Sequence, residues 1–189
     1  MDDKNKKIGF LVSGRGSNMA AVLEEIAAGR LAAEARVAIS DNPGAPALPL
    51  AAGRGLSAVL VERKNFPRRL EFEEALVRVL EGHGVDLVVL AGFMRLLGPT
   101  VLAAFPGRVI NIHPSLLPAF PGLEAQRQAL DYGVKIAGCT VHYVNEVMDG
   151  GRIIAQAAVP VEPEDTVESL GARILAQEHR LLARAIAGL

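Results

Sequence analysis

The first half of the chain alternates short apolar runs with segments of helical periodicity, and this alternation limits the fold more than any other feature. Apolar residues recur at helical spacing in two segments, residues 18–28 and about 67–82. Strands that alternate with helices are typical of βαβ units, so the pattern predicts a parallel sheet. The runs that favour strands are residues 8–12, 35–40, 57–61, 86–91 and 108–112.

The second half of the chain has a different pattern. Residues 139–144 and 152–161 are typical of two longer strands joined by the loop NEVMDGG, which predicts an antiparallel or mixed edge of the sheet. A closing helix is expected to begin near Asp165, which together with Glu168 resembles a capping box. The apolar stripe of this helix consists of Val167, Leu170, Ile174, Leu181 and Ala185.

Composition limits the class of protein. The 189 residues suit one domain with a substantial core, and no apolar run approaches the ~20 residues that span a bilayer. Basic residues number 20 against 21 acidic ones, without a basic block, so the electrostatic footprint of a nucleic-acid binder is missing. The charged start MDDKNKK has no apolar signal segment behind it, and the single Cys139 excludes an internal disulfide, so we expect a cytoplasmic protein.

The sequence SGRGSN, residues 13–18, lies between the first predicted strand and the first predicted helix. Its glycines let the backbone turn sharply, and N–H groups exposed at a helix N-terminus suit a phosphate. Met19 stands where a dinucleotide fingerprint would have its third glycine, so phosphate binding is favoured over a dinucleotide site. The alternative is a plain turn in which Ser17 or Asn18 caps the helix.

Asn111 and His113 lie at the end of the fifth predicted strand, before the proline-rich SLLPAFPG. Residues at i and i+2 of a strand share a face, so we expect the amide and the imidazole to lie side by side. Open α/β sheets bind ligands at the carboxyl ends of their strands, which makes the pair a candidate catalytic site. A structural histidine with one backbone hydrogen bond is the alternative.

Asp149 lies in the MDGG turn between the two late strands. A role in the turn alone is one interpretation, since Asp-Gly pairs are common in turns. If the turn folds over His113, the carboxylate would favour the imidazolium form and create an acid–base couple. The histidines lack the close spacing of metal ligands, and Cys139 in an alternating strand indicates burial rather than a nucleophile.

Five ordered motifs together resemble the phosphoribosylglycinamide formyltransferase family, folate-dependent enzymes of purine synthesis. The resemblance runs nearly end to end and implies an α/β, doubly wound, mostly parallel sheet with helices on both faces and an antiparallel extension in the C-terminal half. It implies a single domain of residues 1–189, in which roughly residues 8–108 hold the ribonucleotide phosphate and residues 109–189 supply catalysis and folate binding. The motifs are SGRGSN, AGFMRLL at 91–97, NIHPSLLPAFPG at 111–122, VHYVNEVMDGG at 141–151 and QEHRLL at 177–182.

The resemblance also assigns roles to individual residues. It implies a catalytic trio of Asn111, His113 and Asp149. Leu175 and Gln126 depart from residues found in some relatives, and these departures concern the finer ribonucleotide contacts. The implied ribonucleotide-binding residues are Gly14, Arg15, Gly16, Ser17, Asn18 and Glu178. The implied folate-binding residues are Arg69, Met94, Arg95, Leu96, Leu97, Asn111, Val144, Asn145, Glu146, Val147, Met148 and Asp149.

The activity that the resemblance implies is transfer of a formyl group from 10-formyltetrahydrofolate, a co-substrate, to the amine of glycinamide ribonucleotide. Asn111 and protonated His113 would donate hydrogen bonds to the oxyanion of a tetrahedral intermediate, with no metal. We expect small-molecule substrates, no nucleic-acid or membrane partner, and a monomer or homodimer. The rivals are a formyl-folate deformylase and a methionyl-tRNA formyltransferase, each with a further domain that we do not expect here, and a non-catalytic nucleotide sensor.

Overall fold

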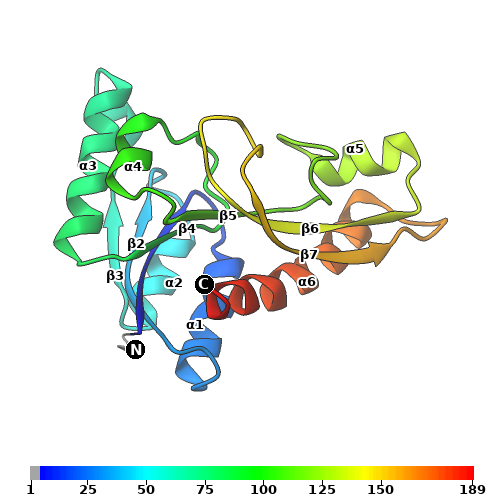
Figure 1. Cartoon of the computed structure of the whole chain (residues 1–189), viewed down its shortest axis with the longest axis horizontal. Helices are drawn as coiled ribbons and strands as arrows, with labels where there is room; N and C mark the ends of the chain where they lie inside the picture. The colour runs from blue at the N-terminus through cyan, green and yellow to red at the C-terminus, as the bar shows by residue number, and fades with distance from the viewer. Residues whose placement is uncertain (1–4) are drawn as a thin grey trace. The chain divides into compact units, whose positions relative to one another are not determined.

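The computed structural model describes residues 5–189, and the chain divides into two compact units, Met1–Ile110 and Asn111–Leu189 (Figure 1). The first four residues of the charged start MDDKNKK lie outside the described residues. The described residues contain seven strands and six α-helices, which alternate except where one strand follows another near the C-terminal end. The strands form a mostly parallel sheet with an antiparallel part, so the predicted α/β fold class is confirmed.

Four parallel strands form the sheet of the first unit, in the order β3-β2-β1-β4. The first four of the five predicted runs became these strands. Apolar residues of the central strands fill the interior, since Leu87–Leu90 is buried at every position and Phe10 and Leu11 are fully buried, whereas the edge strand Ser57–Leu60 is mostly exposed. The strands are β1 (Lys6–Val12), β2 (Ala33–Ser40), β3 (Ser57–Leu60) and β4 (Leu87–Leu90).

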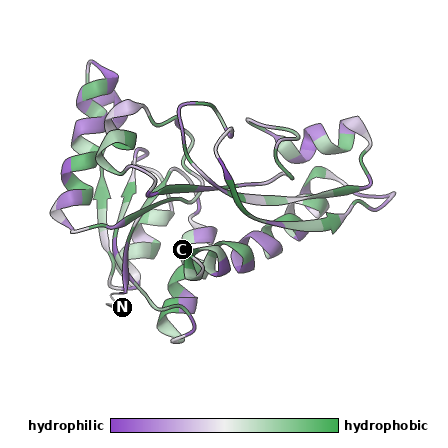
Figure 2. Cartoon of the chain, in the orientation of Figure 1, coloured by the Kyte–Doolittle hydropathy of each residue, from purple (hydrophilic) through white to green (hydrophobic). Residues whose placement is uncertain are grey.

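Helices cover both faces of this sheet (Figure 1). Because βαβ crossovers are right-handed, α1 and α2 lie on one face, and the connection from β3 to β4 runs the opposite way and places α3 on the other. Helix α3 packs against α4, and its alternating purple and green turns in Figure 2 show its amphipathic character. The helices are α1 (Ser17–Ala27), α2 (Ala47–Gly53), α3 (Arg69–Gly82) and α4 (Pro99–Ala104), and a short 3-10 helix spans Arg63–Asn65.

The second unit contains an antiparallel pair of strands, β6 (Ile136–Tyr143) and β7 (Ile153–Pro160). Strand β6 begins earlier than the expected residue 139, because Ile136 pairs with Pro160 and the ladder continues to the end of β7. Strand β5 (Val109–His113) leads into the unit, and α6 packs against both β6 and β7 and against α5. The two helices are α5 (Ala125–Tyr132) and α6 (Val167–Ala187).

The cap of α6 lies one residue later than predicted. Thr166 Oγ1 accepts a hydrogen bond from the Ser169 N–H at 3.2 Å, and Ser169 Oγ accepts one from the Thr166 N–H at 2.9 Å. These reciprocal bonds form the capping box, so the predicted pair of Asp165 and Glu168 was wrong. Asp165 instead pairs with Arg173 at 2.7 Å, and the hydrogen bonds it receives hold the pKa of its carboxyl well below the usual range.

Cys139 is a core residue of β6, as predicted from its alternating strand. Its side chain is fully buried. Burial, together with the charge of Glu178, raises the pKa of the Cys139 thiol to about 12, so the thiolate needed for nucleophilic attack does not form near neutral pH. Within residues 5–189, no helix combines the length and apolar character required to cross a bilayer.

Candidate active site

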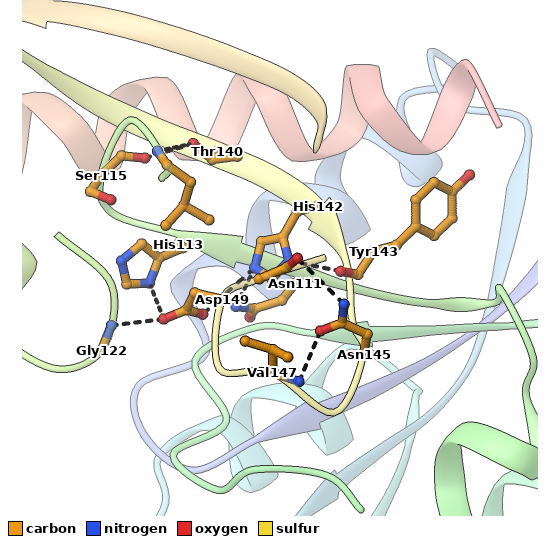
Figure 3. Close-up of polar contacts among 12 residues, drawn as sticks. Asn111, His113, Ser115, Gly122, Thr140, His142, Tyr143, Asn145, Val147 and Asp149 are labelled. Carbon is orange, nitrogen blue, oxygen red and sulfur yellow. Dashed lines mark hydrogen bonds and ion pairs between the residues drawn. The ribbon is translucent and has the colours of Figure 1, made fainter. Parts of the chain in front are cut away.

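Strand β5 ends in the residues of the candidate active site. The buried side chains of Ile110 and Ile112 anchor the strand in the core. On the same strand, Asn111 is half-buried and His113 is almost fully buried. His113 Nε2 lies 2.9 Å from the Phe120 carbonyl oxygen. The chain after β5 therefore folds back over the imidazole (Figure 3).

Asp149 reaches His113 from the loop between β6 and β7. Its Oδ2 lies 3.4 Å from His113 Nδ1 and accepts a hydrogen bond from the Gly122 N–H at 2.8 Å (Figure 3). Both ring nitrogens of His113 thus face oxygen atoms, one from the Phe120 carbonyl and one from the Asp149 carboxylate. The geometry meets the condition set from the sequence, a carboxylate folded over the histidine.

Opposing effects act on the pKa of the Asp149 carboxyl. Burial alone would raise its pKa, but hydrogen bonds from His142 and from the Gly122 N–H, together with the charges of His113 and His142, lower it below the usual value. Asp149 also adopts a left-handed backbone with φ 52°, which aspartate tolerates better than most residues. The carboxylate therefore stays ionised beside the imidazoles throughout the neutral range.

His142 is a member of this cluster that the sequence interpretation missed. It is 2% exposed, and its Nε2 lies 3.2 Å from Asn111 Nδ2 and 3.6 Å from Asp149 Oδ1, while its Nδ1 lies 2.8 Å from the Tyr143 carbonyl oxygen (Figure 3). The contact between the His142 ring and the Asn111 amide holds the amide in place at the end of β5. The available signal was two polar residues, Thr140 and His142, at i and i+2 of an otherwise apolar strand.

Thr140 fixes the segment that follows His113. Its hydroxyl donates to the Ser115 carbonyl at 2.7 Å and accepts from the Leu117 N–H at 3.0 Å (Figure 3). Gln156 of β7 adds a hydrogen bond to the Leu117 carbonyl at 2.9 Å. The proline-rich segment after β5 is therefore attached to both strands of the antiparallel pair.

The predicted phosphate loop forms the entry to α1. Gly16 occupies the position before the helix with φ 75°, and a side chain there would place its Cβ 2.7 Å from Ala47 Cβ. Glycine is therefore required at this position. No side chain caps α1, so the alternative in which Ser17 or Asn18 is the cap was wrong. The N–H groups of Ser17 and Asn18 belong to the first turn, where a helix favours anions.

Both arginines expected to contact folate have partners within the first unit. Arg69 donates to the buried Glu73 at 2.6 Å and to the Leu96 carbonyl at 2.9 Å, and Arg95 forms an ion pair with Asp41. The segment they hold has its Met94 and Leu96 side chains exposed, whereas Leu97 is buried. Their first role in the structure is to shape residues 94–97.

The remaining expected binding residues lie in the second unit. Asn145 shapes the loop after β6, since its Oδ1 accepts from the Val147 N–H at 3.0 Å (Figure 3). The loop residues Val144, Glu146, Val147 and Met148 are half-buried or exposed, with Val147 65% exposed. Glu178 is buried on α6. The two departures from the family, Leu175 of α6 and Gln126 of α5, are half-buried.

Within residues 5–189, His, Cys, Asp and Glu side chains form no group of three arranged to hold a metal ion. The polar cluster of the second unit has instead the composition of an acid–base and oxyanion-binding site. It offers one amide, two imidazoles and one carboxylate, from Asn111, His113, His142 and Asp149.

Comparison with known proteins gives four concordant matches. Residues 6–186 match the family model described as formyl transferase. The chain is 43% identical over 175 residues to phosphoribosylglycinamide formyltransferase of Bacillus subtilis (strain 168), covering 93% of this chain and 90% of that protein. It is 42% identical over 189 residues to the trifunctional purine biosynthetic protein adenosine-3 of Drosophila melanogaster, covering 99% of this chain and 14% of that protein. The crystal structure of glycinamide ribonucleotide transformylase 1 from Symbiobacterium toebii matches with a TM-score of 0.96 and 51% identity, covering 99% of this chain and 88% of that chain.

Proposed function

We propose that this chain, which belongs to the phosphoribosylglycinamide formyltransferase family of purine biosynthesis, transfers the formyl group of 10-formyltetrahydrofolate to the amine of glycinamide ribonucleotide. Membership of this family makes the chain an enzyme with a formyl-folate co-substrate. The observation that carries the finer proposal is the contact of Asp149 with His113, on the same strand end as Asn111.

The reaction forms a bond between the substrate amine and the formyl carbon and breaks the bond from that carbon to folate N10. Negative charge develops on the formyl oxygen in the tetrahedral intermediate, where hydrogen-bond donors stabilise it by roughly 3 kcal/mol each. The Asn111 amide has two N–H groups. One of them points to His142 Nε2 at 3.2 Å, which leaves the other for the oxyanion.

The imidazolium of His113 supplies the second donor. Its Nε2–H is engaged by the Phe120 carbonyl at 2.9 Å, so donation to the oxyanion requires the substrate oxygen to replace that carbonyl. Asp149 favours the charged ring through its carboxylate at 3.4 Å. The proton released by the amine passes through a water beside Asp149 to folate N10, so that charge and atoms balance.

The other half of the proposal concerns binding. The N–H groups at the start of α1, in the turn from Gly14 to Asn18, bind the phosphate of the ribonucleotide, and Glu178 is a further contact to the ribonucleotide. Residues 94–97 and the loop from Val144 to Asp149 bind the folate. The reaction takes place in the cytoplasm in a monomer or homodimer, and no step needs a metal.

Formyl transfer in vitro tests this proposal. Purified protein, 10-formyltetrahydrofolate and glycinamide ribonucleotide should produce formylated ribonucleotide, followed by the absorbance change of the folate and by mass spectrometry of the product. A chelator should leave the rate unchanged. If the folate loses its formyl group equally fast without the ribonucleotide, the chain is a deformylase, and if no turnover occurs with either, it is a non-catalytic binding protein.

A further inference from the structure

Three loops of the first unit are joined by a cluster of polar side chains at the carboxyl ends of neighbouring parallel strands. Ser13 follows β1, Asp41 follows β2, and Met94 and Arg95 come after β4. Because β2, β1 and β4 are adjacent and parallel, these residues emerge at the same edge of the sheet. Ser13 immediately precedes the turn that we assign to phosphate, and Met94 and Arg95 begin the segment that we assign to folate.

The Ser13 hydroxyl bridges the other two loops. It donates to Asp41 Oδ1 at 2.6 Å and accepts from the Met94 N–H at 3.0 Å. A hydroxyl has a single proton, and an ionised carboxylate can only accept a hydrogen bond. The Ser13 proton is therefore donated to Asp41, and the Ser13 oxygen accepts from the Met94 N–H. The Ser13 backbone adds a hydrogen bond from its N–H to the Gly92 carbonyl at 3.0 Å. A shift of Ser13 therefore moves the backbone at Met94.

Asp41 extends the connection to Arg95. Its second oxygen, Oδ2, forms an ion pair with the Arg95 guanidinium, and the Asp41 side chain is only 6% exposed. The Asn42 side chain, one residue further on, donates to the Ser13 carbonyl at 3.1 Å. The carboxylate is thus shared between the residue before the phosphate turn and the first charged residue of the folate segment.

We propose that the cluster of Ser13, Asp41 and Arg95 couples the two substrate sites, so that binding of the ribonucleotide strengthens binding of the folate, and the reverse. This inference rests on the proposed function, which assigns the two loops to the two substrates. A phosphate bound at the turn after Ser13 orders the hydroxyl, and through Asp41 and the Met94 N–H it orders residues 94–97 in advance. The folate then binds a segment that is already ordered, so its binding costs less conformational entropy. This effect is positive cooperativity between the two substrates.

A second buried carboxylate provides a matched control. Glu73 is 2% exposed, holds Arg69 at 2.6 Å and accepts from the Gly98 N–H at 2.8 Å. It supports the far end of the same segment, and among residues 5–189 its hydrogen bonds go to Arg69 and Gly98 and not to Ser13 or Asp41. Loss of its charge should weaken folate binding without changing the coupling.

The test measures binding of glycinamide ribonucleotide by calorimetry, alone and with saturating tetrahydrofolate, which carries no formyl group and allows no turnover. In the wild type, tetrahydrofolate should lower the Kd of the ribonucleotide by about fivefold or more, the lower end of ordinary allosteric coupling. Asp41→Asn and Ser13→Ala should each reduce this ratio to less than about twofold. Glu73→Gln should weaken tetrahydrofolate binding and keep the wild-type ratio.

Each outcome decides the proposal. A wild-type ratio near one, or an unchanged ratio in Ser13→Ala, overturns the coupling even when formyl transfer proceeds normally. If Asp41→Asn melts at a much lower temperature than the wild type, Ser13→Ala, which keeps the Asp41 ion pair with Arg95, carries the test alone. A wild type without formyl transfer removes the proposed function, and the coupling of substrates with it.

Discussion

The Asp149 carboxylate lies 3.4 Å from His113 Nδ1, and both side chains are nearly buried, at 12% and 6% exposure. Charge is poorly screened in such a setting, and the charge of His113 is one of the causes that lower the pKa of the Asp149 carboxyl. The other carboxylate oxygen lies 3.6 Å from His142 Nε2, and His142 in turn lies beside Asn111. The contact between Asp149 and His113 is thus the centre of a connected polar cluster, and most of the following predictions test that cluster.

Replacing Asn111 or His113 by alanine should lower kcat by about a hundredfold or more, because each removal deletes one oxyanion donor. The KM values should change much less, since the donors act mainly in the transition state. Steady-state kinetics measures both parameters, and thermal denaturation checks the fold. His83→Ala serves as the control, because His83 lies at the end of α3 and should leave kcat unchanged. Near-normal kcat in His113→Ala would refute the catalytic assignment.

Asp149→Asn should lower kcat at neutral pH with little change in structure. The amide removes the negative charge beside His113, so the imidazolium becomes less favourable at every pH. Asparagine also tolerates the left-handed backbone at this position, which limits any loss of fold. NMR titration of the His113 ring in both proteins checks the cause. Identical titration curves would show that the carboxylate does not influence the ring.

The stability of Asp149→Asn relative to the wild type should depend on pH. Folding lowers the pKa of Asp149, so the ionised carboxylate stabilises the native state at a pH above the unfolded value of about 3.9. This stabilisation is lost as the pH falls through the folded pKa. Urea denaturation at pH 7 and at pH 3 should therefore show the variant less stable at pH 7 and a smaller difference at pH 3. A constant difference at both pH values would contradict the pKa shift.

The two glycines of the phosphate turn should respond differently to alanine. At Gly16 an added Cβ would lie 2.7 Å from Ala47 Cβ in a left-handed backbone, so Gly16→Ala should destabilise the fold and raise the ribonucleotide KM. Gly14 has no heavy atom within 4 Å of an added Cβ, so Gly14→Ala should keep the wild-type Tm. A raised ribonucleotide KM in Gly14→Ala at normal Tm would support close approach of the phosphate, and a raised folate KM alone would oppose it.

Thr166→Ala should reduce the free energy of unfolding by about 1 kcal/mol, because it removes the cap of α6. Chemical denaturation measures the change. Thr100→Ala is the matched control, since Thr100 lies inside α4, where Gly98 occupies the cap position. Equal losses in the two variants would mean that the capping bonds of Thr166 contribute nothing to stability.

The sequence by itself determined the local elements and the side-by-side placement of Asn111 and His113. Apolar runs such as 8–12 and 86–91 became β1 and β4, and the stripe through Leu170 and Ile174 became the buried face of α6. These features depend on periods of two and 3.6 residues, which a short window of sequence already contains. The family resemblance rests on motifs of the same local kind.

Only the tertiary structure decided which distant side chains meet. The register of β6 against β7 and the fold of the intervening loop bring Asp149 to His113, and they place His142, absent from the sequence interpretation, beside Asn111. Asp165 illustrates the same principle, because its pairing with Arg173 leaves the capping role to Thr166. A carboxylate takes the partner that burial and geometry offer, and those are properties of the packed chain that no local pattern contains.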